Sequence, residues 1–125
     1  MNHNVARHTA QAFRINFTDM INESSNNALP EGLISMLLKV RDFADQAGEL
    51  GVNRPDSNTA YFQEDMAKVW FHAQKALADA QIVKAKITRE RDDSAQAESD
   101  RFRRSNVTFH AAWIETILKN VVNAG

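Results

Sequence analysis

Apolar residues between Tyr61 and Ile87 recur at alternating intervals of four and three. This spacing places them on one face of a helix, as in the seam where two helices pack together. The residues on this face are Phe62, Met66, Val69, Ala73, Ala76, Ala80, Val83 and Ile87. The pattern predicts a long amphipathic helix, and the small residues at its centre predict a closely packed neighbour.

A further apolar line runs along the same predicted helix. It consists of Phe71, Ala78, Ile82 and Ala85, and a shorter apolar line consists of Trp70 and Leu77. Because these lines leave little of the helix surface polar, we expect other helices to cover the predicted helix on more than one side.

The segment from Thr59 to Ala124 contains neither glycine nor proline. As a single helix it would be about 100 Å long at 1.5 Å per residue, so we favour a hairpin. Residues 91–94 interrupt the apolar pattern, and Asp93 followed by Gln96 resembles a capping box at the start of a helix. We therefore expect antiparallel helices over about 59–91 and 94–123.

A turn at this place sets Ala80 opposite Phe109 and Ala76 opposite Trp113. Small residues facing large ones keep the summed volume across a seam nearly constant. We therefore expect Phe109 and Trp113 to fill the hairpin seam, which continues towards Ile117. The same register predicts two ion pairs between the helices, Arg89 with Asp100 and Asp79 with His110.

The N-terminal half predicts two shorter helices. Apolar residues at helical spacing indicate a first helix over 4–22, and the polar, proline-containing segment 22–30 ends it. A second helix over about 31–49 is densely apolar, as expected of a core or interface helix. Gly48 is a stop signal before a loop over 48–58, where Asp56, Ser57 or Asn58 would cap the next helix. The predicted fold is all-α, a four-helix bundle in which residues 1–125 form a single domain.

Composition narrows the functional classes. The 125 residues include no cysteine and carry a formal net charge of -1, so disulfides are excluded and no global charge favours nucleic acid. The N-terminus has no secretory pattern, and no window approaches the roughly 20 apolar residues of a membrane span. We expect a cytoplasmic protein without membrane contact.

Catalytic and metal-binding patterns are missing from the sequence. None of the four histidines has a second histidine or a carboxylate at the i+3 or i+4 spacing of a helical metal site. The carboxylate pairs Glu64–Asp65 and Asp92–Asp93 are adjacent in sequence, so on a helix they point about 100° apart and do not converge. We therefore expect no metal and no cofactor, and we favour a non-enzymatic function.

Basic residues gather at the predicted hairpin tip. They are Lys84, Lys86, Arg89, Arg91, Arg101, Arg103 and Arg104. Five acidic residues share this segment and leave a net charge of +2, so the tip is either a solvated, salt-bridged surface or a contact for a nucleic-acid backbone.

The motif from Arg104 to His110 resembles the Arg-x(4–6)-His signature of the HEPN ribonucleases. The resemblance covers seven residues and implies a small helical bundle that cuts RNA as a dimer, with Arg104 and His110 at the active site. On a continuous helix these two residues lie about 240° apart, whereas Arg103, Asn106 and His110 share a face.

The sequence favours a non-enzymatic interaction protein, such as an adaptor, an accessory subunit or an inhibitor. Its expected partner is another protein bound through a helix face, because the apolar residues exceed what one hairpin seam can cover. A homo-oligomer is compatible with the same pattern. The alternatives are a subunit that contacts nucleic acid through the hairpin tip and a HEPN-like ribonuclease.

Overall fold

The computed structural model describes residues 3–22, 29, 31–54, 59–89 and 94–124, and every regular element among them is helical. The elements are α1 (His3–Asn22), α2 (Glu31–Asn53), α3 (Ala60–Arg89) and α4 (Ser94–Ala124). The predicted all-α class with four helices is therefore confirmed. Within the described ranges, no helix has the length and apolarity needed to cross a membrane.

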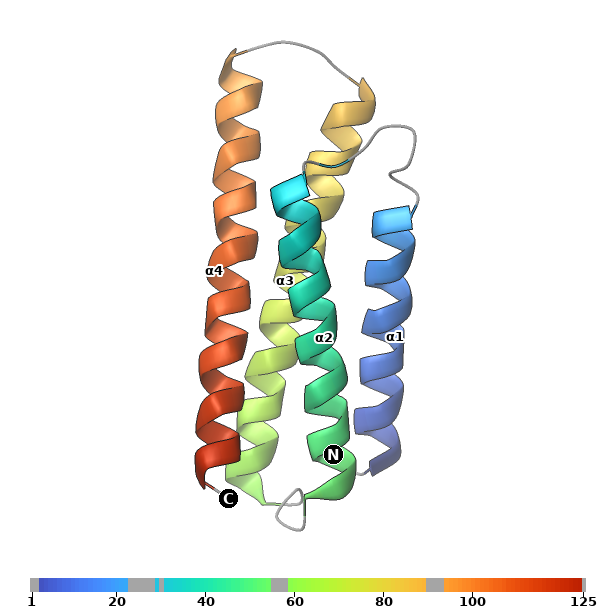
Figure 1. Ribbon diagram of the computed structural model, residues 1–125, viewed down its shortest axis with the longest axis vertical. Coiled ribbons are helices and arrows are strands. Elements are labelled where there is room, and N and C mark those ends of the chain that lie inside the picture. The colour runs from blue at the N-terminus through green and yellow to red at the C-terminus, as the bar shows by residue number, and fades with distance from the viewer. Residues whose placement is uncertain (1–2, 23–28, 30, 55–58, 90–93, 125) are drawn as a thin grey trace.

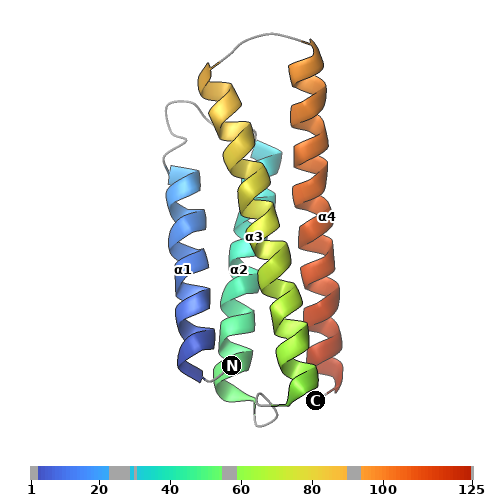
Figure 2. The ribbon, with the colours of Figure 1, turned by 180° about the vertical axis from the view of Figure 1, so that it is seen from behind.

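The four helices run alternately up and down and form an elongated bundle (Figure 1). α3 and α4 lie side by side and antiparallel in both views, and α2 packs against both of them and against α1 (Figures 1 and 2). One end of α3 and α4 extends beyond α1 and α2 (Figure 1). The two short helices therefore cover only part of the long pair.

The predicted seam of α3 is buried. From Phe62 to Val83, each of its seven side chains is at most 5% exposed, and the side chain of Ile87 lies outside the described residues. Opposite this seam, α4 contributes aliphatic side chains at the same alternating spacing of four and three. They are Val107, Ala111, Ile114, Leu118 and Val121.

One expectation about the hairpin is wrong, because Phe109 and Trp113 do not fill the seam but are 55% and 46% exposed. Other helices do cover α3 on more than one side, since it contacts α1, α2 and α4, but Phe71 stays 55% exposed. The line through Phe109 and Trp113 becomes polar at Thr116 and Asn120, whereas the line beginning at Val107 stays apolar. Burying that second line leaves no polar side chain unsatisfied. Ile117 is buried as expected.

α2 does not end at Gly48, which corrects the expected loop over 48–58. The helix continues to Asn53 through Gly48 and Gly51, and both glycines are buried against α1. A Cβ added to Gly48 or Gly51 would lie less than 3.0 Å from the Cβ of Ala10 or Ala6, respectively. The glycines are therefore needed for the close approach of the two helices, which a helix-stop interpretation overlooks.

The start of α3 is capped by Thr59. Its hydroxyl accepts a hydrogen bond from the backbone N–H of Phe62 at 3.3 Å, the usual role of an N-cap residue. The three cap residues expected from the sequence, and the Asp93 cap expected for α4, lie outside the described residues.

Candidate functional site

Four large aromatic side chains face solvent on α3 and α4, and Tyr61, near the start of α3, is the most exposed of them at 83%. Phe71 and Phe109 are each 55% exposed and Trp113 is 46% exposed. Phe109 and Trp113 meet edge to face, with ring centroids 6.3 Å apart. By contrast, Phe13, Phe17 and Phe62 are buried in the core. We call Phe71, Phe109 and Trp113 the aromatic face.

A pair of histidines joins these three rings. The Nδ1 atoms of His72 and His110 lie 2.9 Å apart. The His72 ring stacks on Trp113 with centroids 6.0 Å apart and an interplanar angle of 4°, and it meets the edge of Phe71 at 5.4 Å. The His110 ring meets Phe109 at 5.6 Å. Each ring of the aromatic face therefore contacts a histidine of the pair.

Asp79 of α3 contacts two residues of α4, His110 and Arg103. Its Oδ1 accepts a hydrogen bond from Nη1 of Arg103 at 3.1 Å, and its Oδ2 lies 4.0 Å from Nε2 of His110. The contact between Asp79 and His110 was expected from the sequence and is confirmed. In the His72–His110 and Asp79–Arg103 contacts, the partner on α4 lies seven residues, about two turns, before the one predicted, whereas Asp79 and His110 meet in the predicted register.

Burial lowers the pKa of both histidines. For His72 the second cause is the nearby His110 imidazole. For His110 the Asp79 carboxylate raises the pKa and the Lys75 ammonium lowers it, with a net shift downwards. Both imidazoles therefore resist protonation more than an exposed histidine does.

A groove of about 590 Å³ lies beside Trp113, and all its lining residues come from α3 and α4. Its walls combine aromatic, aliphatic, charged and amide side chains. They are Asp65, Lys68, His72, Phe109, Trp113, Thr116, Ile117 and Asn120. The mixture suits a bulky apolar side chain with polar neighbours.

Among the described residues, no three His, Asp or Glu side chains come together in a way that could hold a metal ion. The arrangement can stack on planar or apolar groups, and it can donate and accept hydrogen bonds through the imidazoles.

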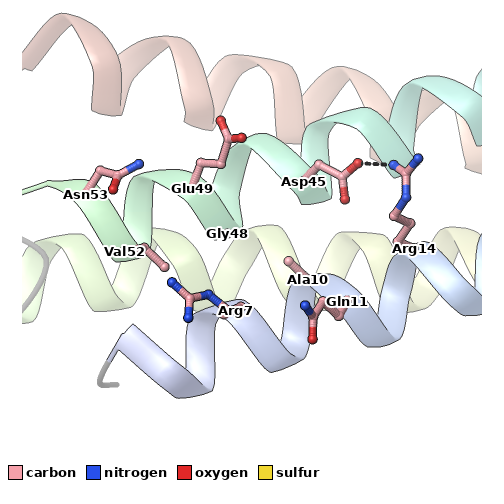
Figure 3. A pocket seen from close by; sticks show the side chains of 9 residues that line it. All are labelled: Arg7, Ala10, Gln11, Arg14, Asp45, Gly48, Glu49, Val52 and Asn53. Atoms are coloured by element: carbon pink, nitrogen blue, oxygen red, sulfur yellow. Dashed lines mark hydrogen bonds and ion pairs between the residues drawn. The ribbon is translucent and has the colours of Figure 1, made fainter.

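A second hollow, of about 470 Å³, lies between α1 and α2 (Figure 3). Arg7 and Arg14 come from α1, and Asp45 and Glu49 come from α2, with Gly48 between them. Arg14 and Asp45 form an ion pair across the hollow. Since basic side chains of one helix face acidic side chains of the other, this hollow is accounted for by the packing of α1 on α2.

Among the described basic residues of the tip, Arg103 lies apart from Arg101 and Arg104. Arg103 pairs with Asp79. Arg101 is exposed and Arg104 half-buried, and both line a different hollow with Gly32 and Met36 of α2. Lys84 is half-buried. The side chains of Lys86 and Arg89, and the whole of Arg91, lie outside the described residues.

The residues of the HEPN-like motif also lie apart. His110 faces α3 and contacts His72, whereas Arg104 lines the hollow against α2. Arg103 and His110 do share a face, since both reach Asp79. The expected separation of Arg104 from His110 is therefore confirmed.

Local spacing rules missed His72, because its partner is 38 residues away in the chain. A longer spacing does carry a signal. His72 and Asp79 are seven residues apart on α3, and Arg103 and His110 are seven apart on α4. Two heptad-spaced polar pairs beside antiparallel apolar seams could have indicated a cluster between the helices.

No protein-family model matches the chain, and comparisons with curated proteins and with solved structures also find no match.

Proposed function

We propose that this chain is a non-enzymatic interaction protein that binds an amphipathic helix of another protein on its aromatic face. The observation that carries the proposal is the exposure of Phe71, Phe109 and Trp113 by about half each. Two of these rings, Phe109 and Trp113, line a groove large enough to receive further side chains. Adjacent exposed aromatic residues are common at protein–protein contacts.

The energetics favour this surface. Fully burying a side chain the size of phenylalanine contributes about 1.5–3 kcal/mol, and the three rings are only partly buried in the free chain. The rings are also held in place by the histidines, so less side-chain entropy is lost on binding.

Charge indicates the chemistry of the partner. Lys68 lines the groove, and Lys75 lies over the Phe71 ring, with its Nζ 5.5 Å from the ring centroid. Asp65 offsets Lys68 at the groove, so the exposed Lys75 beside Phe71 is the cation that fits an acidic residue next to the apolar anchors of a partner helix. A second copy of this chain fits less well. A two-fold axis between residues 68 and 75 of α3 would bring Lys68 of one copy against Lys75 of the other.

Affinity isolation with matched variants tests the proposal. The test variant replaces Phe71, Phe109 and Trp113 with serine. The control replaces Ile15 and Val122 with serine, since these residues are 59% and 47% exposed but line neither the groove nor the aromatic face. We expect one protein to be retained by the parent and the control and lost from the test variant. Calorimetry with the purified partner should show the same order.

The contrary outcomes are distinct. A partner retained equally by the test variant would contradict the assigned surface. Recovery of DNA or RNA alone would favour the basic tip instead. Self-association of the parent that the serine substitutions abolish would identify a second copy as the occupant and would overturn the choice of an acidic partner.

A further inference from the structure

The histidine pair occupies the centre of the aromatic face. His72 contacts Phe71 and Trp113, and His110 contacts Phe109. The side chain of His110 is only 14% exposed. The positions of the three rings therefore depend on how these imidazoles sit against each other.

The contact between the imidazoles limits how many protons they can hold. Two Nδ1 atoms 2.9 Å apart form a hydrogen bond only if one donates and the other accepts. With both rings neutral, or with one protonated, an accepting nitrogen remains. With both rings protonated, two N–H groups and two positive charges face each other, and the contact becomes repulsive.

The surrounding charges do not remove this repulsion. On α3, Asp79 offers one negative charge, but it also pairs with Arg103 of α4. Lys75 of α3 acts against protonation of His110. At the groove, Asp65 and Lys68 bring one charge of each sign. Among the described residues, Asp79 is the carboxylate in contact with the pair, and because it also pairs with Arg103 it offsets a second proton only in part.

We propose that His72 and His110 form a proton-sensitive switch that holds Trp113 in the aromatic face and releases it when both rings are protonated. The lowered pKa values are consistent with a switch that stays closed at neutral pH and opens on acidification. Its effect on partner binding rests on the proposed function, in which Trp113 is an anchor. The partner should then bind less tightly as the pH falls.

NMR of the isolated protein tests the switch without any partner. Imidazole ¹⁵N shifts report protonation, and NOEs between the His72 and Trp113 rings report their stacking. From about pH 7.5 to about pH 5, we expect the two histidines to titrate in coupled steps. The NOEs should disappear as the second proton binds.

The variant His110→Gln separates repulsion from protonation itself. Glutamine keeps a hydrogen-bonding side chain but cannot carry the charge, so the NOEs between His72 and Trp113 should persist across the whole pH range. The switch is overturned if the NOEs of the parent persist when both rings are protonated, or if the parent and the variant lose them alike. Either failure would leave the proposed docking surface standing, because the measurement uses no partner.

Discussion

His72 and His110 bring their Nδ1 atoms to 2.9 Å although they are 38 residues apart in the chain. This contact joins α3 to α4 beside their buried aliphatic seam. It also sets the three rings of the aromatic face in place. The histidine pair therefore connects the register of the long helices with the surface that we propose for partner binding.

Stability should fall as the pH drops below the ordinary histidine value of 6.5. Burial lowers the pKa of both rings in the folded chain, so just below this pH the unfolded chain binds more protons than the folded chain. The free energy of unfolding then decreases with falling pH until the folded rings also protonate. Urea unfolding at about pH 7.5 and about pH 5.5 measures the loss. The double variant His72→Gln, His110→Gln should lose less, and an equal loss would contradict the assignment.

Asp79→Asn should destabilise the bundle by about 1–3 kcal/mol. The side chain of Asp79 is 14% exposed and that of its partner Arg103 is 30% exposed. The cost therefore falls between the values of exposed and fully buried ion pairs. Glu115→Gln is the matched control, because it breaks an exposed pair with Lys119 on a single helix and should change stability by less than about 0.5 kcal/mol. Equal effects in urea unfolding would contradict a structural role for Asp79.

Gly48→Val should loosen the contact between α1 and α2. The first added carbon already meets the Cβ of Ala10 at a distance that real Cβ atoms do not reach, and such overpacking costs about 1–3 kcal/mol. Ala10→Gly in the same chain should restore part of the loss. Gly32→Ala is the control, because nothing lies within 4 Å of its added Cβ. That substitution should stabilise the helix by about 0.5–1 kcal/mol. Thermal unfolding that ranks the two glycine variants the other way would exclude this packing.

Ile114→Ala should cost about 2–5 kcal/mol, the usual range for truncating a fully buried aliphatic side chain. Ile114 is 0% exposed, whereas the neighbouring Trp113 is 46% exposed. Trp113→Ala should therefore cost less, although it removes more atoms. If chemical denaturation showed the larger loss for Trp113→Ala, then Trp113 would belong to the core and not to a docking surface.

Periodicity was sufficient to predict the helices. The alternating apolar residues of α3 identify its buried face correctly from Phe62 to Val83, because burial of one stripe dominates the stability of an amphipathic helix. The face of α4 that packs against α3 was harder to predict. Two lines of α4, one through Phe109 and one through Val107, both follow helical spacing. Only the line through Val107 stays apolar along its length, and this is the one signal that favours it.

Two features required knowledge of the tertiary contacts. In the sequence, a glycine at position 48 suggests the end of a helix. Only the closeness of Ala10 in the structure shows why a glycine is needed there although the helix continues. The histidine pair forms between residues on different helices, so no local motif contains both members. A displacement of seven residues along α4, about two turns, keeps the same helix face turned to α3 but changes which side chains meet, and the apolar pattern does not determine it.

Photo-crosslinking in cells tests the proposed docking surface most directly. A photoreactive phenylalanine analogue replaces Phe109 in one variant and Ile15 in another, since both positions are more than half exposed. We predict that position 109 gives a covalent adduct with one protein, through a segment with apolar and acidic residues, and that position 15 gives no adduct with that protein. An adduct of that protein from position 15 and none from position 109 would contradict the assignment of the aromatic face.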